Sequence, residues 1–221
     1  MYVAPLYVVG ADLSGPANTL NTGIAVFAAG DGVLNFVDQQ CDGSDASLYS
    51  MVKALSRKAP VVVGLDAPLS YEPGGGQRVR DKKLRKEIVQ RGLRPGAVMA
   101  PMAPRMVYLT LRGIVLAQVL SALRTEHQVR VVEVHPGASL SFRDAPLDAI
   151  LTFSTDETAR EALLEWLPSQ HIQGIRPPAP CGSHFVAACA GQQQRGIGTA
   201  VGLGGWRERS SLGIRMTLPC N

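Results

Sequence analysis

One stretch decides the fold of this chain: VVVGLDAPLS, from Val61 to Ser70. Its run of β-branched residues predicts a strand buried on both faces, of the kind found in the middle of a mostly parallel sheet. Asp66 comes where the apolar run ends, and Pro68 stops the strand because proline cannot donate to a sheet ladder. Open α/β sheets place their chemistry at the carboxyl ends of such strands, so Asp66 is a candidate site residue. The simpler alternative is an aspartate that caps the following turn.

The segments before this strand predict a three-stranded meander and a crossover helix. The strands are expected at Leu6–Leu13, Gly23–Ala29 and Val33–Val37, and the helix from Ser44 or Asp45 to about Lys58. Short hairpins make the first three strands antiparallel, whereas the crossover helix makes the fourth strand parallel to its neighbour. If the fourth strand pairs with the first, Asp12 and Asp66 lie at the same edge of adjacent strands.

The segments after Ser70 predict a helical insertion and a fifth strand. A basic helix is expected at Arg78–Arg91, an apolar helix at Arg105–His127 and a strand at Val129–Val134. The fifth strand repeats the layout of the fourth, because the acid Glu133 follows its apolar run and a proline comes shortly after. Weaker patterns predict further elements at Asp156–Leu167 (helix), Ser183–Gln194 (helix) and Gly213–Leu218 (strand).

The composition describes a globular protein with one basic segment. Apolar residues make up 46% of the 221 residues and charged residues 18%, as in a folded domain. Between Gln77 and Arg130 there are 12 Lys or Arg and three acids, a net charge of +9, so the remainder carries −5 of the total of +4. The basic segment favours an anionic partner such as nucleic acid, although a solvated surface face explains it equally well. The basic helix has no aromatic residue, which argues against stacking on single-stranded bases there.

Neither a secretory leader nor a membrane span is expected. The chain does not begin with a basic, apolar, small-residue leader, which indicates a cytoplasmic protein. The apolar run Met106–Leu123 is interrupted by Arg112 and Gln118, so a buried helix is expected there. The sequence does not indicate an oligomeric state.

Asp12 and Asp66 together point to a metal site. Neighbouring strands lie about 4.8 Å apart. Two carboxylates that close repel each other by ~1 kcal/mol in water and by several times that in a less polar cleft. A divalent cation is the most economical reason for such a pair, and Mg²⁺ or Mn²⁺ suits oxygen ligands. Turn-capping and hairpin roles are the alternatives for both residues.

Four short motifs resemble one family. They are Gly10–Pro16 (GADLSGP), Gly64–Leu69 (GLDAPL), Arg80–Arg85 (RDKKLR) and Glu133–Gly137 (EVHPG). In this order the chain resembles the family catalogued as domain of unknown function 429, whose members are described as predicted nucleases with a ribonuclease H-like fold. The stretch from Gly205-Trp206 to Leu218-Pro219 is similar to the family's closing strand. The resemblance implies a ribonuclease H-like α/β fold: a mixed five-stranded sheet of order 3-2-1-4-5 with strand 2 antiparallel, helices on both faces and a helical insertion after strand 4.

The resemblance also implies which residues form the site. Asp12, Asp66 and Glu133 are the implied acidic ligands for Mg²⁺ or Mn²⁺, with Asp81 as an outer candidate. One position departs from the family pattern. Members commonly carry an acid in a late helix, as in His-x-x-Asp-Ala, whereas this chain reads HFVAA from His184 and has Ala187 at that position. The departure leaves open whether a four-carboxylate site, and therefore an active enzyme, is present.

The expected function is metal-dependent hydrolysis of phosphodiester bonds in nucleic acid. In a two-metal nuclease, ions about 3.5–4 Å apart activate a water and stabilise the leaving oxygen. Asp12 would bridge both ions, and Asp66 and Glu133 would each complete one site. His135 would move a proton or contact phosphate, unless it is only a hydrogen-bonded turn residue. Glu133 and Asp81 have a simpler alternative as acids paired with a nearby arginine. Contacts to phosphate are expected from the basic helix, at Arg78, Arg80, Lys82 and Arg85.

Two other functions stay open. A degenerate member of the family would bind nucleic acid or a protein partner without turnover, because Ala187 replaces an acid. A phosphotransferase of the sugar-kinase and actin-like superfamily would use the hairpin Asp12–Gly15 to bind the phosphates of ATP. That alternative needs a second copy of the fold, for which 221 residues leave little room. The sequence shows neither an internal repeat nor a clear linker, so we expect one domain over residues 1–221, with the helical insertion at about 72–127.

Overall fold

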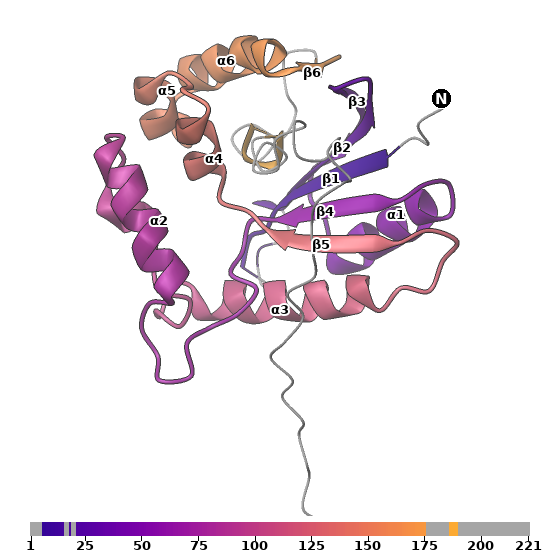
Figure 1. The fold of residues 1–221 in the computed structure, drawn as a ribbon, viewed down its shortest axis with the longest axis horizontal. Coiled ribbons are helices and arrows are strands. Elements are labelled where there is room, and N and C mark those ends of the chain that lie inside the picture. Colours follow the sequence, from indigo (N-terminus) through magenta and orange to yellow (C-terminus); the bar gives the residue numbers. More distant parts are fainter. Residues whose placement is uncertain (1–5, 16–17, 19–20, 176–185, 190–221) are drawn as a thin grey trace, which may run out of the picture.

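A central mixed sheet organises the protein (Figure 1). The structure, a computed structural model, describes residues 6–15, 18, 21–175 and 186–189. The strands are β1 (Leu6–Asp12), β2 (Gly23–Gly30), β3 (Val33–Gln40), β4 (Val61–Leu65), β5 (Val129–Glu133) and β6 (Ile172–Gln173). They lie in the order β5-β4-β1-β2-β3-β6, with β2 antiparallel to both neighbours and all other pairs parallel.

The predicted order is confirmed for five strands, but the predicted count of five is wrong. As expected, β1 lies between β2 and β4, and β5 lies beyond β4. The sixth strand, β6, pairs in parallel with the outer edge of β3. Because β6 consists of Ile172 and Gln173 alone, it is too short to leave an alternating pattern in the sequence.

The turn between β2 and β3 fixes the register of the meander. Asp31 and Gly32 have φ angles of 51° and 77°, the left-handed values that a two-residue type I′ turn requires. Aspartate and glycine are among the residues that adopt this conformation most readily. The short hairpin expected between the second and third strands is therefore observed.

The helices match the stronger sequence patterns and add two short ones. They are α1 (Asp45–Ser56), α2 (Val79–Gln90), α3 (Val107–Ser121), α4 (Pro136–Phe142), α5 (Leu147–Thr152) and α6 (Glu157–Trp166), with 3₁₀ turns η2 (Pro95–Ala97) and η3 (Leu167–Gln170). Ser44 caps α1, since its Oγ accepts a hydrogen bond from the Ser47 N–H at 3.0 Å. The helix expected at Arg105–His127 ends earlier, at Ser121. The sequence did not predict α4 or α5.

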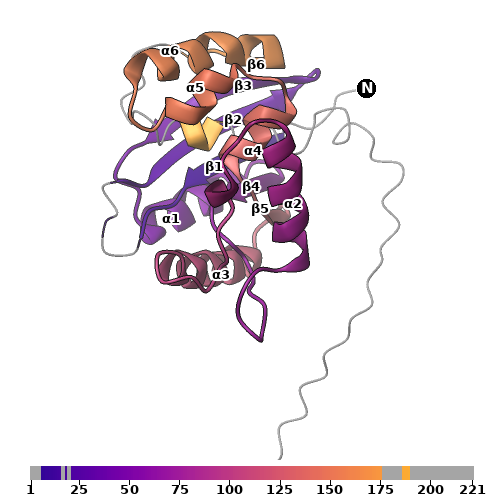
Figure 2. The ribbon, with the colours of Figure 1, turned by 90° about the vertical axis from the view of Figure 1, so that its left-hand side faces the viewer.

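Helices cover both faces of the sheet, as expected (Figures 1 and 2). Alternate strand residues such as Val9 and Val63 pack with α1 and α3 in one core. On the opposite face, residues such as Phe27 pack with α4, α5, α6 and Ile88 of α2. The sheet therefore separates two apolar layers, and the elements after β4 and β5 frame the carboxyl ends of the central strands.

The apolar helix α3 is buried on one face only. Leu116 and Leu120 pack beneath the sheet, whereas Tyr108, Leu111, Val115 and Val119 are exposed. The expectation of a fully buried helix is therefore wrong for half of its surface. In the part of the chain that the structure describes, no helix has both the length and the apolar character needed to cross a membrane.

Two weaker predictions fall largely or wholly outside the described residues. The helix expected at Ser183–Gln194 is described only at residues 186–189, which are helical. The last strand expected at Gly213–Leu218 lies outside the described ranges.

Candidate functional site

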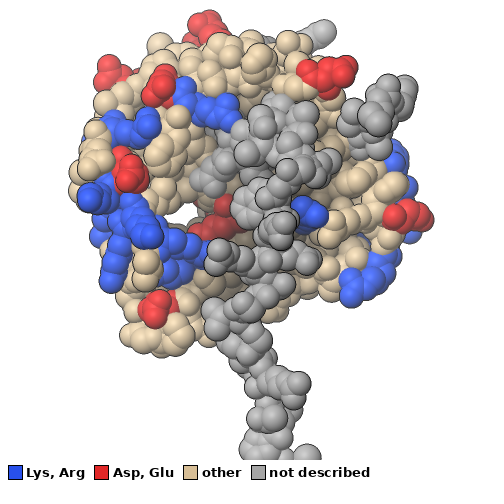
Figure 3. Space-filling view, viewed as in Figure 1, with Lys and Arg blue, Asp and Glu red and all other residues tan. Residues whose placement is uncertain are grey.

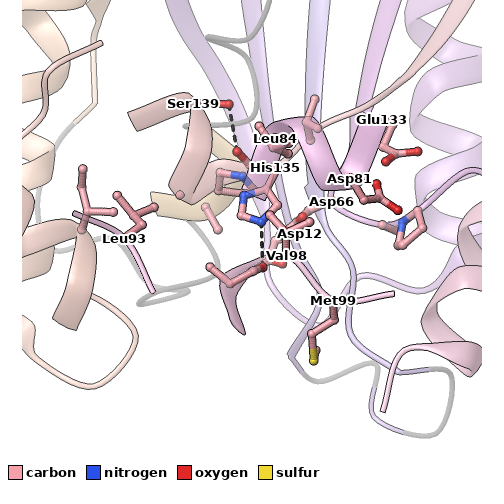
Figure 4. Close-up of a pocket in the computed structure, with 18 of the residues that line it drawn as sticks. Asp12, Asp66, Asp81, Leu84, Leu93, Val98, Met99, Glu133, His135 and Ser139 are labelled. Atoms are coloured by element: carbon pink, nitrogen blue, oxygen red, sulfur yellow. Dashed lines mark hydrogen bonds between the residues drawn. The ribbon is translucent and has the colours of Figure 1, made fainter. Parts of the chain in front are cut away.

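Asp12 and Asp66 lie side by side at the carboxyl ends of two parallel strands. β1 pairs with β4 in a register that places Ala11 opposite Leu65, and the Asp66 N–H donates to the Ala11 carbonyl at 2.9 Å. The two carboxyl side chains share a hydrogen bond. The proximity expected from the sequence is therefore confirmed, and Figure 4 shows the two residues together.

Two glycines lie next to this pair in the strands. Gly10 and Gly64 are opposite each other in the register and come two residues before Asp12 and Asp66. Residues two apart on a strand project from the same face. The carboxyl pair therefore stands next to two positions without side chains, on the face of the sheet that α4, α5 and α6 cover.

The shared hydrogen bond requires one of the two carboxyl groups to carry a proton. The pKa of Asp66 is raised well above its usual range, first by burial and then by the charge and hydrogen bond of Asp12. The charge of Glu133 raises it further. The pair binds a proton more tightly than isolated carboxyls do, which is the electrostatic situation that a bound cation would relieve.

Glu133 is near this pair but is held by other partners. The register pairs Glu133 with Leu65 and not with Asp66, so its position on β5 belongs to the opposite face of the sheet. Its carboxylate accepts hydrogen bonds from the Leu69 N–H at 2.8 Å and from Arg78 at 2.5 and 2.8 Å. Arg80 adds a third partner at 3.0 Å. In Figure 4 Glu133 stands apart from Asp12 and Asp66.

Arg78 bridges two acids at the start of α2. Besides Glu133, it binds Asp81 through its Nε at 2.8 Å and a terminal nitrogen at 2.6 Å. It also donates to the Ser70 carbonyl at 3.0 Å. Burial alone would lower the pKa of Arg78, but hydrogen bonds to Asp81 and Glu133 outweigh it and raise the pKa. Asp81 thus lies at the predicted edge of the site, with both oxygens bound to Arg78.

His135 caps α4. Its Nδ1 accepts a hydrogen bond from the Ala138 N–H at 3.2 Å, so that nitrogen carries no proton. Its Nε2 lies 2.9 Å from the Ala97 carbonyl, which can only accept, so Nε2 is the donor. This fixes one neutral tautomer and links η2 to the start of α4. A role in proton transfer would require His135 to give up one of these contacts.

A cleft of about 1130 Å³ connects these residues. Its lining includes all four candidate acids, together with His135, Arg78 and Arg80. The other two residues predicted to contact phosphate, Lys82 and Arg85, belong to α2 but are not part of the lining. Figure 3 shows the basic side chains gathered beside a hollow with acidic side chains at its edge. Arg85 also donates to the Val98 carbonyl, which ties α2 to the segment after η2.

Two residues of α3 position the loops that follow Asp12 and Asp66. The guanidinium of Arg112 donates to the Ser14 carbonyl at 2.6 Å and to the Thr22 hydroxyl at 3.1 Å, and it pairs with Asp45 at 2.7 Å. Next to it, Gly113 lies so close to the other loop that a Cβ there would be 2.7 Å from the Cβ of Ala67. The sequence did not predict these roles; the only signal was a charged residue within an apolar helix.

Among the described residues, the two candidate acids that lie side by side are Asp12 and Asp66. Within residues 6–15, 18, 21–175 and 186–189, no three His, Cys, Asp or Glu side chains are grouped to hold a metal ion. Ala187, where the family pattern has an acid, is buried and lines the cleft.

The sequence of this chain matches the model of one protein family. The family model described as "Protein of unknown function (DUF429)" matches residues 10–190, most of the chain. The chain belongs to this family. No curated protein matches the chain.

Proposed function

We propose that this protein is a metal-dependent nuclease with a ribonuclease H-like fold, which hydrolyses phosphodiester bonds in nucleic acid. The observation that carries the proposal is the Asp12–Asp66 pair, which two parallel strands hold at the floor of an arginine-lined cleft. Carboxylates at the carboxyl ends of adjacent central strands are the position where α/β folds bind ligands. The family match alone does not specify an activity.

The Asp12 and Asp66 carboxylates suit Mg²⁺ or Mn²⁺. Both residues offer hard oxygen ligands, and Mg²⁺ keeps several waters, so two protein carboxylates are enough to hold it. When bound, the ion would supply positive charge to the phosphoryl oxygens and lower the pKa of a water. Glu133 would complete the predicted three-acid set only after it releases Arg78, and for that reason we assign the ion to the aspartate pair first.

The other cleft residues orient the substrate. Arg80 is exposed over 56% of its side chain and can bind a phosphate oxygen while it remains near Glu133. Arg78 is buried and forms ion pairs with Asp81 and Glu133, so it positions Glu133 and, through a hydrogen bond, the loop at Ser70. His135 fixes η2 against α4 and so shapes the opening of the cleft.

The test is cleavage of labelled RNA, DNA and hybrid duplexes with Mg²⁺ or Mn²⁺. Asp12→Asn and Asp66→Asn are expected to abolish cleavage, since each removes one carboxylate of the pair. Asp31→Asn is the matched control, because Asp31 lies in the β2–β3 turn and asparagine tolerates the same left-handed backbone. Cleavage that persists in both site variants would refute the assignment. Hydrolysis of ATP without cleavage of nucleic acid would favour the phosphotransferase alternative.

Ala187 favours a second candidate, a protein that binds nucleic acid without turnover. The residue lines the cleft at the position where the family pattern carries an acid. Binding without cleavage in the assay above would support this candidate. Ala187→Asp then provides a direct comparison: if the missing carboxylate is the cause, the variant gains metal-dependent cleavage that the natural sequence lacks.

A further inference from the structure

The aspartate pair lies in a recess between two walls. Asp12 and Asp66 are half-buried, and the cleft above them is lined by α2 and the η2 segment on one side and by α4 and α5 on the other. Its volume of about 1130 Å³ is slightly above the range of about 300–1000 Å³ typical of small-molecule pockets. A few nucleotide units fit such a space.

Positive charge is spread along this recess. Arg80, Arg94 and Arg143 line the cleft, one from each of three separate segments. Guanidinium groups bind phosphate oxygens with matched geometry. Arginines at three places along the cleft suit a ligand with repeated phosphates better than one with a single anionic group.

The same recess has exposed apolar side chains. Phe142, at the end of α4, is 41% exposed, and Met99 is 39% exposed; both line the cleft. The guanidinium of Arg91 lies 4.9 Å from the centre of the Phe142 ring and donates to the neighbouring Ser141 carbonyl at 2.9 Å. The ring is therefore held in place at the cleft. An aromatic surface is thus present near the basic helix, although that helix has no aromatic residue of its own.

We infer from the residues that line the cleft that it binds an unpaired nucleic-acid strand. The bases would contact Phe142 and Met99, and the phosphates would contact Arg80, Arg94 and Arg143. The inference rests on the proposed function and names its substrate class. Stacking platforms combined with positive charge are how proteins bind single strands, because every base has an apolar face. In a duplex the base faces are already stacked on one another, so they cannot stack on Phe142 or Met99.

The test is binding of one labelled oligonucleotide as a single strand and as a duplex. Fluorescence anisotropy with the full chain in EDTA measures binding without turnover. We expect the single strand to bind roughly ten-fold tighter or more, and Phe142→Ala to weaken single-strand binding by a similar factor. Phe142→Tyr keeps the ring and should keep the affinity. Tyr108→Ala is the matched control, because Tyr108 is an exposed aromatic on α3 outside the cleft lining.

Each outcome separates this inference from the proposed function. Equal or tighter duplex binding, no binding of either form, or Phe142→Ala with unchanged affinity and an unchanged melting temperature would overturn the inference. Metal-dependent cleavage of duplex with the single strand left intact would support a nuclease and overturn the inference. Single-strand binding that depends on Phe142, without cleavage in Mg²⁺ or Mn²⁺, would support the inference and overturn the proposed turnover.

Discussion

The main chains of β1 and β4 place Asp12 and Asp66 side by side. The Asp66 N–H is bonded to the Ala11 carbonyl, and the strands on which the two residues lie pair along their length. The fold therefore imposes the repulsion, and the raised pKa of Asp66 reflects it.

Asp66→Asn is expected to stabilise the metal-free protein at neutral pH. The folded pKa of Asp66 lies above its ordinary value of 3.8, so the folded state holds a proton that the unfolded chain has released. Stability is consequently lost as pH rises from the unfolded pKa through the folded pKa. Asparagine does not titrate, so the variant does not lose this free energy of unfolding as pH rises. Its Tm should exceed that of the natural protein by about 2–4 °C for each kcal/mol of unfolding free energy that is retained.

Thermal unfolding in EDTA across a pH series checks this prediction. The difference in Tm between Asp66→Asn and the natural sequence should grow through that window and be smallest below pH 3.8. Asp31→Asn should show no such trend. A difference between Asp66→Asn and the natural protein that does not vary with pH would contradict the raised pKa.

Arg78→Gln is expected to destabilise the protein by about 3 kcal/mol, because loss of one partner leaves buried charges unpaired. The side chains of Arg78 and Asp81 are both nearly inaccessible, and Glu133 loses two hydrogen bonds. Denaturant unfolding measures the change. Lys82→Gln, one turn away on the exposed side of α2, should change stability by less than about 0.5 kcal/mol. Equal effects of the two substitutions would show that the bridge contributes little.

At the residue scale, the sequence predicted that Asp12 and Asp66 are neighbours, and the observed contacts of Glu133, Asp81 and His135 match the simpler alternatives given for them. Asp12 and Asp66 could be placed because an apolar run and a following turn define where a strand ends. Glu133 follows the same pattern, yet it stands opposite Leu65, one position away from Asp66. Such a one-residue offset changes the face of the sheet and cannot be read from single strands.

At the scale of elements, α3 determines how the two aspartate loops sit. Arg112 holds the loop after β1, and Gly113 allows the helix to approach the loop after β4. Leu116 and Leu120 of the same helix pack in the apolar core beneath the sheet. A helix that the sequence describes only as apolar therefore positions both halves of the candidate site.

Gly113→Ala is expected to destabilise the protein by about 1–3 kcal/mol despite the better helix propensity of alanine. The new Cβ would lie 2.7 Å from the Cβ of Ala67 and 3.1 Å from the Pro68 carbonyl oxygen, so the loop after Asp66 must move. Denaturant unfolding and Mn²⁺ titration followed by electron paramagnetic resonance measure stability and metal affinity.

Gly96→Ala is the matched control, because no atom outside its immediate neighbours lies within 4 Å of a Cβ there. It should leave both stability and Mn²⁺ affinity nearly unchanged. If Gly113→Ala behaves like this control, the close approach of α3 does not position the Asp66 loop.

The long periodic elements could be predicted from the sequence, and the short ones could not. α1, α2 and α6 follow helical spacing over several turns and were found with small errors at their ends. α5 and β6 have six and two residues, too few to establish a period. The exposed apolar residues of α3 could not be predicted from the sequence either, because hydrophobicity predicts burial only on average.

At the scale of the whole molecule, exposed positive charge is concentrated on α2, beside the cleft. Lys82, Lys83 and Lys86 are exposed on α2, and Figure 3 shows basic side chains gathered beside the hollow. A field of one sign along a cleft attracts an oppositely charged ligand and accelerates its association. The net charge of +4 for the whole chain does not reveal this uneven distribution of charge.

Changing Lys82, Lys83 and Lys86 together to Gln is expected to lower the affinity for nucleic acid. The affinity of the variant should also depend less steeply on salt concentration. Each lost phosphate contact on a single strand reduces the slope of log affinity against log salt by about 0.7, so three contacts remove roughly 2. Anisotropy titrations at several salt concentrations measure the slope. The same change at Lys53, Arg57 and Lys58 of the α1 region is the control and should leave the slope unaltered. Equal slopes for both triple variants would exclude α2 as the phosphate-binding surface.

The position of β1 in the middle of the sheet has a consequence for how the chain folds. β1, β2 and β3 follow one another in the sequence and can pair soon after they are synthesised, since local contacts form fastest. β4 reaches its place beside β1 only after α1 has crossed over the sheet. We therefore expect the nascent meander to expose an unpaired β1 edge on the ribosome, with Asp12 at its end, until β4 arrives and the two acids meet.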